Sequence, residues 1–267
     1  MDNRSKVTDT LFLNMRRAAF VTKNMPGMFV DSKAAELSEK LPSKYMDISG
    51  DSEYAMVITA ASMKSTDMCV QTFLKFNKDG IVVNLGSGLS TTFFRNDNGV
   101  NVWYEVDTED IASLRKTVFG ENERDIPLPY SMFSDEWIDT VKQQGKPVLF
   151  IASDVLYYYT YDRVVEYLKK LASIPNSEIV FDAVGKNGVD HMRKYSRNFA
   201  VGGKDTFFYV HDPVKLVRDI GGNAKIISVR DSFSQINSRK GLSLESKLNM
   251  FWANYRHMLK TCYIKLS

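Results

Sequence analysis

The feature that most constrains the fold is a series of short apolar runs of strand length. They are IVVNL at 81–85, NVWYEV at 101–106, PVLFIAS at 147–153 and EIVFDAV at 178–184. Each run is continuous rather than alternating, which is typical of strands buried on both faces of a parallel sheet. The segment 161–172 between the last two runs, YDRVVEYLKKLA, has its apolar residues on one helical face. Strand, helix and strand in this order predict an α/β fold.

Helical patterns precede the first strand. Apolar residues recur at helical spacing over 11–21, Asp31 or Ser32 can cap a second helix that ends before Pro42, and 55–76 also has a helical pattern. The C-terminal third adds three shorter expected strands, TFFYVH, KIISVRDSF and CYIKL. Because ligands of such sheets bind at the carboxyl ends of the strands, we expect the N-terminal helices to form a lid there.

Composition excludes several classes of protein. A chain of 267 residues with 44% hydrophobic content suits one α/β domain, and a dispersed net charge of +3 gives no reason to expect nucleic acid as a partner. Two isolated cysteines, Cys69 and Cys262, predict neither a zinc site nor a disulfide framework. Polar residues interrupt the apolar N-terminal stretch, so we expect no signal peptide and no membrane span. These observations predict a cytoplasmic protein.

A glycine pair after the first strand indicates a ligand site. Gly86 and Gly88, separated by Ser87, allow a sharp turn and a close approach of a ligand to the backbone. Glu105 follows Gly86 by 19 residues, where a carboxylate at the end of the next strand can bind ribose hydroxyls. In the alternative interpretation Glu105 and Asp107 only cap the helix that follows. The third position of a dinucleotide fingerprint is here Thr91, which favours S-adenosylmethionine over NAD.

Several motifs in a fixed order make the chain similar to a known family. They are TDTLFLNMRRAAFV, MFVDSKAAELSEKL, VVNLGSGLSTTFFRNDNGVNVWYEVDTEDIASLRKTVF, YSMFSDEWID, PVLFIASDVLYYYTYDRVVEYLKKL, EIVFDAVG and YIKLS. With these motifs the chain resembles the S-adenosylmethionine-dependent O-methyltransferases of the leucine carboxyl methyltransferase type, in the tetracenomycin-type polyketide branch. The resemblance implies a Rossmann-like, seven-stranded, mostly parallel sheet with helices on both faces. It also implies one domain over 1–267: a helical lid at 1–50, a cofactor-binding core at 51–200 and a C-terminal part at 201–267.

The resemblance also implies roles for individual residues. Gly86 and Gly88 would bind the methionine part of the cofactor, Glu105 the ribose, and Ser131 and Met132 would flank the adenine, while Trp137 is expected to pack. The full expected cofactor set is Lys64, Gly86, Ser87, Gly88, Glu105, Val106, Asp107, Ser131, Met132, Ser153 and Asp154. An apolar substrate wall is expected from Phe12 and Met15, with Tyr157 and Tyr158 near the pocket entrance; apolar residues at helical spacing also serve simply to dock a helix.

The chain departs from the family pattern at several positions. The family's GLDTR is here Gly-Leu-Ser-Thr-Thr at 88–92, its arginine before the first strand aligns with Ser62, and its Ala-Glu-Gly aligns with 152–154. Lys64 is the expected substitute for the arginine, and Asp154 for the carboxylate that holds the cofactor's ammonium. These departures leave open a non-catalytic or regulatory member of the same fold.

The implied reaction is transfer of a methyl group to an oxygen of a small acceptor. A carboxylate acceptor is already ionised and needs no base, whereas a phenol or enol benefits from one. Among the three histidines, His211 is the candidate base, because it follows an expected strand; the alternative is that it closes the turn before the helix DPVKLVRDI. The sequence specifies neither the acceptor nor the oligomeric state.

Overall fold

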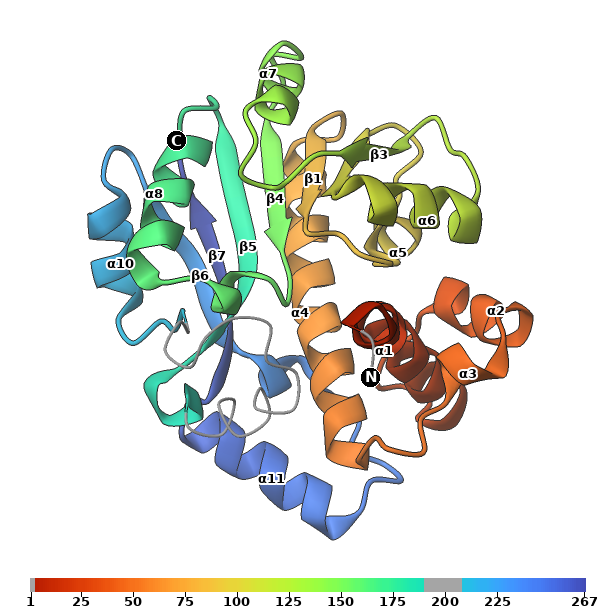
Figure 1. Ribbon diagram of the computed structural model, residues 1–267. Helices are drawn as coiled ribbons and strands as arrows, with labels where there is room; N and C mark the ends of the chain where they lie inside the picture. Colours follow the sequence, from red (N-terminus) through yellow and green to blue (C-terminus); the bar gives the residue numbers. More distant parts are fainter. Residues whose placement is uncertain (1–2, 190–207) are drawn as a thin grey trace.

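A seven-stranded sheet organises the molecule (Figure 1). The structure is a computed structural model that describes residues 3–189 and 208–267, with side chains described from residue 11 onward. The strand order is β3-β2-β1-β4-β5-β7-β6. All pairings from β3 to β5 are parallel, and β7 is antiparallel to both of its neighbours. The expected seven-stranded, mostly parallel, Rossmann-like sheet is thereby confirmed.

The strands and helices have the following bounds. The strands are β1 (Ile81–Leu85), β2 (Trp103–Asp107), β3 (Asp125–Pro129), β4 (Val148–Ala152), β5 (Ser177–Val184), β6 (Lys225–Asp231) and β7 (Leu259–Lys265). The helices are α1 (Asn3–Asn24), α2 (Ser32–Lys40), α3 (Ser43–Met46), α4 (Glu53–Phe76), α5 (Thr92–Asn96), α6 (Glu109–Phe119), α7 (Glu136–Lys142), α8 (Tyr161–Leu171), α10 (Pro213–Ile220) and α11 (Leu244–Tyr255), with short 3-10 turns such as η1 (Leu156–Tyr158) and η3 (Ser232–Gln235).

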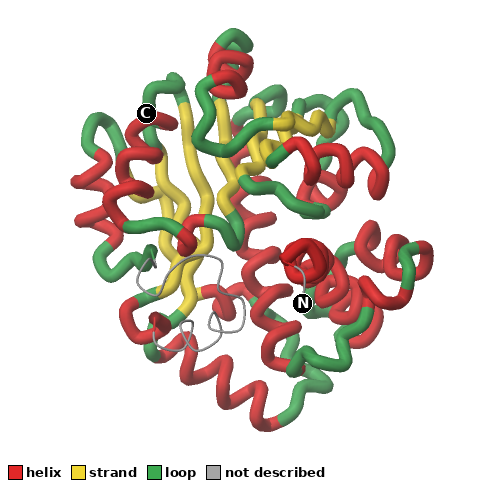
Figure 2. Tube along the Cα trace, viewed as in Figure 1, coloured by secondary structure: helices red, strands yellow, loops and turns green. Residues whose placement is uncertain are grey.

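Helices cover both faces of the sheet (Figure 2). On one face, α7, α8 and α10 pack their apolar side chains against β1, β4 and β5 in the largest buried cluster of the chain. On the other face, α4 and α5 contribute Phe73 and Phe93, which pack with Trp103 of β2 and Leu149 of β4. Alternate residues of each central strand therefore enter two different cores, which explains why these strands lack polar–apolar alternation.

Side-chain caps begin several of the predicted helices. The Asp31 carboxylate accepts a hydrogen bond from the Ala34 N–H at 2.9 Å and starts α2, as the sequence predicts. Ser52 and Thr160 cap α4 and α8 in the same way. Each cap satisfies an N–H that the first helical turn leaves without a partner. Local sequence therefore fixes where these helices begin.

One expected strand is wrong, and two elements were not expected. Residues 208–211 of TFFYVH form no strand, while 206–207 of that run lie outside the described residues. Strand β3 has the sequence DIPLP, whose two prolines remove ladder donors, so it has no continuous apolar pattern. The helix α11 was also not expected from the periodicity. Its exposed face carries large apolar residues, so the sequence does not show the usual amphipathic pattern: Leu244, Leu248, Phe251, Trp252 and Tyr255.

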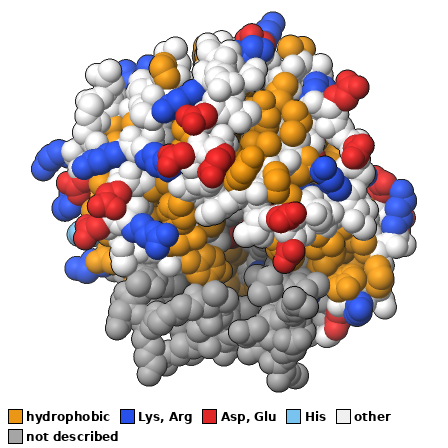
Figure 3. Space-filling view, turned by 45° about the horizontal axis from the view of Figure 1, so that its top comes forward, with side chains coloured by type: hydrophobic (Ala, Val, Ile, Leu, Met, Phe, Trp, Pro, Cys, Tyr) orange, Lys and Arg blue, Asp and Glu red, His pale blue; other side chains and the backbone are white. Residues whose placement is uncertain are grey.

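The N-terminal helices pack beside the carboxyl ends of the central strands (Figure 1). α1 packs against α2, α3 and α4, and its apolar residues share a second core with α11 and η3. No helix in the described ranges is long and apolar enough to cross a membrane. Basic and acidic side chains are interspersed over the face drawn in Figure 3, in keeping with the small net charge.

Candidate functional site

The turn after β1 has the backbone that a close ligand approach requires. Gly86 and Gly88 have φ angles of +60° and +50°, in the left-handed region that favours glycine. A Cβ on Gly86 would lie 2.9 Å from Cγ2 of Val155, which follows β4. Between the two glycines, the hydroxyl of Ser87 is buried and has no hydrogen-bond partner among the described residues. A buried polar atom of this kind is costly unless a ligand or water satisfies it.

Asp107 is the carboxylate that ends β2 beside this turn. Its Oδ2 accepts a hydrogen bond from the Gly88 N–H at 2.8 Å, and its Oδ1 accepts one from the Thr108 N–H at 2.8 Å. The side chain is partly exposed, and each oxygen has a second lone pair for a further donor. The N-cap of α6 is Thr108, so Asp107 does not cap that helix and the capping interpretation is not confirmed. Asp107 is held where a hydroxyl-bearing ligand of the turn can reach it.

The expected position of Glu105 at the end of the strand is wrong. β2 continues to Asp107, and Glu105 lies within the strand, opposite Asn84 of β1. The Glu105 side chain is fully buried; its Oε2 accepts a hydrogen bond from Asn84 Nδ2 at 2.9 Å, and its Oε1 lies 3.4 Å from Arg115 Nη2. Side chains two residues apart on a strand share a face, so Glu105 points toward α6 below the turn rather than into the site.

An acidic cluster lies at the ends of β4 and β5. Asp154 has a left-handed backbone, with φ of +56°, and its N–H donates to Oδ1 of Asp182 at 2.6 Å. The Tyr157 hydroxyl is in hydrogen-bond contact with the carboxylates of both Asp154 and Asp182. The sequence predicts Asp154 and Tyr157 at this place. It does not single out Asp182. The signal for this residue is a carboxylate in the middle of the otherwise apolar part of the run EIVFDAV.

Burial and mutual repulsion change the acid–base properties of this cluster. Burial, followed by the charge of Asp154, raises the pKa of Asp182 to about 7. Burial and the two carboxylates also raise the pKa of Tyr157 well above its ordinary value, so the hydroxyl keeps its proton. The cluster is therefore negatively charged and can bind a proton near neutral pH. Tyr158 is 43% exposed and lies edge-on to Tyr157.

α1 reaches the site through a face other than the predicted one. Asn14 Nδ2 donates to Oδ2 of Asp154 at 2.8 Å, and Leu11 lies 3.5 Å from the position of a Cβ on Gly88. The expectation that Phe12 and Met15 line a substrate wall is wrong. Both are at most 2% exposed within the core of the N-terminal helices, where Phe12 stacks on Tyr45. One residue turns a helix by about 100°, so Asn14 lies on a different face from Phe12 and Met15, and Leu11, which packs partly against the same core, lies at the border between the two faces.

The segment after β3 has mixed exposure. Ser131 is exposed and Met132 is buried. The Met132 carbonyl accepts hydrogen bonds from Trp137 Nε1 at 3.1 Å and from the Tyr167 hydroxyl at 2.7 Å. Trp137 is fully buried against Phe150, so the expectation that it packs agrees with its position. The two hydrogen bonds to its carbonyl therefore fix the loop backbone at Met132, whereas the Ser131 side chain is exposed.

The Lys64 ammonium, the expected substitute for the arginine of the family pattern, is already engaged in a contact within the protein. Its Nζ donates to the carbonyl of Met28 at 3.0 Å, in the connection between α1 and α2. The lysine therefore links α4 to the N-terminal helices. Ser153, partly buried, follows β4 and leads into Asp154.

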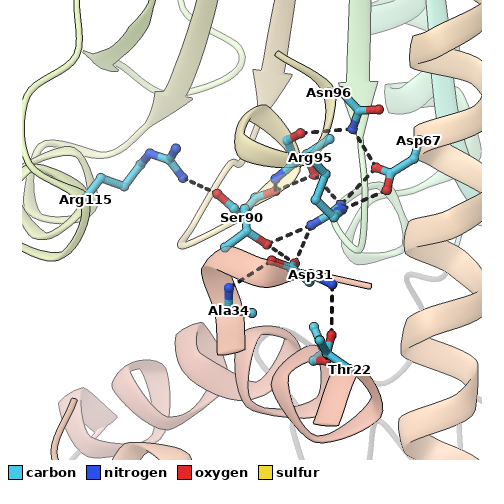
Figure 4. Close-up of polar contacts among 11 residues, drawn as sticks. Thr22, Asp31, Ala34, Asp67, Ser90, Arg95, Asn96 and Arg115 are labelled. Atoms are coloured by element: carbon cyan, nitrogen blue, oxygen red, sulfur yellow. Dashed lines mark hydrogen bonds and ion pairs between the residues drawn. The ribbon is translucent and has the colours of Figure 1, made fainter. Parts of the chain in front are cut away.

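The segment 90–92, in which Ser90 and Thr92 replace the charged residues of the family's GLDTR, lies against the N-terminal helices (Figure 4). Thr91 Oγ1 donates to Oδ2 of Asp31 at 2.5 Å, and Ser90 and Thr92 exchange a hydrogen bond at 2.8 Å. Arg95 forms ion pairs at 2.7 Å with Asp31, at the start of α2, and with Asp67 of α4. Thr91 and Arg95 therefore join α5 to α2 and α4, while Ser90 and Thr92 bond each other at the start of α5.

His211 lies at the start of α10. It is exposed, it makes no hydrogen bond to a described residue, and the neighbouring Asp212 caps α10 by accepting from the Val214 N–H at 2.9 Å. This position agrees with the alternative interpretation, in which His211 belongs to the turn before the helix DPVKLVRDI. Of the other two histidines, His191 lies outside the described residues and His257 pairs with Asp231 on the surface.

Comparison with known proteins decides the family. The family model described as "Leucine carboxyl methyltransferase" matches residues 4–172. The chain belongs to this family. The match covers the lid, the glycine turn, Asp107 and the segment after β4, and it confirms both the expected S-adenosylmethionine-dependent methyltransferase and its cofactor.

One curated relative and several solved structures are similar to this leucine carboxyl methyltransferase family member. The chain is 26% identical over 180 residues to the tetracenomycin polyketide synthesis O-methyltransferase TcmP of Streptomyces glaucescens, a match that covers 67% of this chain and 66% of that protein. A methyltransferase structure from Thermobifida fusca YX aligns with a TM-score of 0.54 and 13% identity, covering 88% of this chain and 86% of that one. Magnesium protoporphyrin IX methyltransferase from Synechocystis PCC 6803, solved with bound SAH, aligns with a TM-score of 0.50 and 14% identity over 94% and 98% of the two chains. At these identities the structures support the fold.

Proposed function

We propose that the protein transfers a methyl group from S-adenosylmethionine to a hydroxyl or carboxyl oxygen of a small organic molecule of the polyketide-like class. The observation that carries this proposal is the turn at Gly86–Gly88, with the unpartnered Ser87 hydroxyl inside it and the Asp107 carboxylate at its edge. The family assignment supplies the cofactor, and the similarity to TcmP favours an oxygen acceptor.

The residues of the site suit the parts of this cofactor. Gly86 and Gly88 give the tight turn at which we place the methionine part, with the Ser87 hydroxyl as a candidate contact. Val106 supports this turn: its side chain is fully buried, and its carbonyl accepts from the Gly86 and Ser87 N–H groups at 2.9 and 3.2 Å. Asp107 replaces Glu105 in our assignment of the ribose contact, because Asp107 reaches the site and Glu105 does not. Ser131 and Met132 remain our candidates for the adenine side, with the exposed serine turned toward solvent.

The acidic cluster suits the positive end of the cofactor. Asp154 stands beside Val155, which touches the Gly86 position, so its carboxylate lies next to the turn. Together with Asp182 it would hold an ammonium group and favour a nearby sulfonium, with Asn14 of α1 and Tyr157 fixing the carboxylates. When bound, S-adenosylmethionine supplies an electrophilic methyl group. The chain then contributes alignment of the acceptor and exclusion of water, which account for much of the rate in such transfers.

A product search tests the proposal without a known acceptor. The purified protein is incubated with S-adenosylmethionine and a panel of fused aromatic phenols and of the matching aromatic carboxylic acids, and products heavier by one methyl group are sought by mass spectrometry. We expect such a product from at least one series. The Asp182→Asn variant shows whether a hydroxyl acceptor depends on this carboxylate as a base, and His211→Ala tests the histidine named from the sequence.

A non-catalytic member of the family is the second candidate. The observation in its favour is that Ser90 and Thr92, which replace charged residues of the family pattern, are engaged in structural hydrogen bonds. Such a protein binds S-adenosylhomocysteine but gives no methylated product with either series of the panel. We further propose a cytoplasmic location, supported by the two buried free cysteines, and a small-molecule acceptor rather than nucleic acid as the partner.

A further inference from the structure

We propose that Arg115 is a positioning residue that sets the shape of the cofactor-binding turn from below. This inference rests on the proposed binding of S-adenosylmethionine at that turn. Arg115 lies on α6 and is 1% exposed, so it contacts no ligand itself. Its Nη1 donates to the carbonyl of Ser90 at 3.0 Å (Figure 4) and to the carbonyl of Gly88 at 3.1 Å. Two carbonyls of the turn therefore share one guanidinium nitrogen.

The two polar backbone groups of Gly88 are both fixed by charged side chains. Its N–H donates to Asp107, and its carbonyl accepts from Arg115. Gly88 has a φ of +50°, in the left-handed region that favours glycine. Charged hydrogen-bond partners on both sides hold this conformation in the absence of a ligand, which lowers the cost of ordering the turn when a ligand binds.

Arg115 is itself held by a buried set of acidic and amide groups. Its Nη2 lies 3.4 Å from Glu105 Oε1 and 3.4 Å from Asp125 Oδ2, and Asn84 donates to the other Glu105 oxygen at 2.9 Å. The guanidinium carbon also lies 4.9 Å from the ring centre of Phe119. A fork with five donors is needed to reach carbonyls on one side and carboxylates on the other, and a lysine ammonium cannot span both.

This arrangement explains why a carboxylate is buried in the middle of β2. Glu105 does not bind the ligand; its Oε1 lies beside Arg115 Nη2 and orients the guanidinium, two residues before the carboxylate that we assign to the site. A series of contacts thereby connects the interior of β1 and β2 to the loop between β1 and α5. It runs from Asn84 to Glu105, from Glu105 to Arg115, and from Arg115 to the carbonyl of Gly88.

Calorimetric titration with S-adenosylhomocysteine of the wild type, Arg115→Lys and Glu105→Gln tests the proposal. We expect Arg115→Lys to bind about tenfold or more weakly, because the loss concerns charge-assisted hydrogen bonds. We expect Glu105→Gln, which keeps an oxygen for Arg115, to stay within about threefold of the wild type, since it removes no ligand contact. The control is Leu168→Ala, a buried residue of α8 that lowers stability without touching the turn.

The outcomes separate this inference from the proposed function. If the wild type binds and folded Arg115→Lys binds equally well, the positioning role is refuted while the function stands. If Leu168→Ala loses as much affinity as Arg115→Lys at equal loss of melting temperature, the effect is one of general stability and the inference also fails. If the wild type itself does not bind, the proposed function fails first.

Discussion

Asp107 and Glu105 stand two residues apart on one face of β2, yet we assign them opposite roles. Asp107 ends the strand and faces the glycine turn, whereas Glu105 is fully buried beneath it. We predict that Asp107→Ala weakens the binding of S-adenosylhomocysteine by about 1.5–3 kcal/mol, the usual cost of losing hydrogen bonds to a charged group. Titration calorimetry at neutral pH measures this loss. An unchanged dissociation constant would move the ribose contact elsewhere.

The buried Glu105 also predicts a dependence of stability on pH. Burial raises its pKa to about 8, against the opposing effect of Arg115. Between the ordinary pKa near 4.5 and this raised value, the folded protein keeps a proton that the unfolded chain has lost, so stability falls as pH rises through this window. Glu105→Gln cannot ionise. We therefore predict that the free energy of unfolding of Glu105→Gln minus that of the wild type increases from pH 5 to pH 8.

Urea denaturation at several pH values measures that difference. Subtracting the wild type removes most of the contribution of Asp182, whose pKa is also raised and which both proteins retain. A difference that stays constant from pH 5 to pH 8 would show that Glu105 is ionised in the folded protein.

The sequence predicts the glycine turn but places Glu105 at the end of β2, a position that Asp107 occupies. The expected position of the carboxylate was counted in residues from Gly86. A difference of two residues along a strand keeps the side chain on the same face but moves it by about 7 Å. For Phe12 and Met15 the error is angular, because the apolar face of α1 docks on its neighbours and the mixed face with Leu11 and Asn14 meets the site. Asp182 and Arg115 were missed because their partners lie far away in sequence.

At the scale of elements, a buried ion-pair network joins the N-terminal helix α2 to α4 and α5. Arg95 joins Asp31 at the start of α2 to Asp67 of α4, and the three side chains are almost fully buried. We predict that Arg95→Met destabilises the protein by about 3–5 kcal/mol, because two buried carboxylates lose their partner. Arg124→Met is the matched control. Its pair with Asp97 is about 30% exposed, so solvent screens it and its loss should cost much less.

Urea denaturation of both variants checks this prediction. Equal losses for Arg95→Met and Arg124→Met would show that the network does not hold the lid. The network also explains why helix starts were predictable and the lid's attachment was not: Asp31 caps α2 through its own segment, whereas its ion pair with Arg95 spans 64 residues.

At the scale of the whole molecule, the sequence predicted the central strands better than the edge strand β3. The central strands are buried on both faces and therefore have continuous apolar runs, whereas β3 contains two prolines. The other edge strand, β6, lies within the expected run KIISVRDSF. The same rule explains α11, whose exposed apolar residues conceal its amphipathic pattern. Family resemblance, carried by motifs in a fixed order, supplied what periodicity alone could not, namely the cofactor.

Ligand binding should raise the stability of the whole fold. At a free concentration of one hundred times its dissociation constant, S-adenosylhomocysteine is expected to stabilise the protein by about 2.7 kcal/mol, because it binds the folded chain alone. A melting experiment with increasing ligand measures this as an upward shift of several degrees. NAD at the same concentrations is the control and should cause no shift, since Thr91 stands where a dinucleotide site needs a small residue.

The most direct test of the central claim is a calorimetric titration of the wild-type protein with S-adenosylhomocysteine, followed by the same titration of Asp107→Ala. We predict one saturable site per chain in the wild type, a clearly weaker site in the variant, and no heat of binding with NAD. A folded wild-type protein that takes up no S-adenosylhomocysteine would contradict the account.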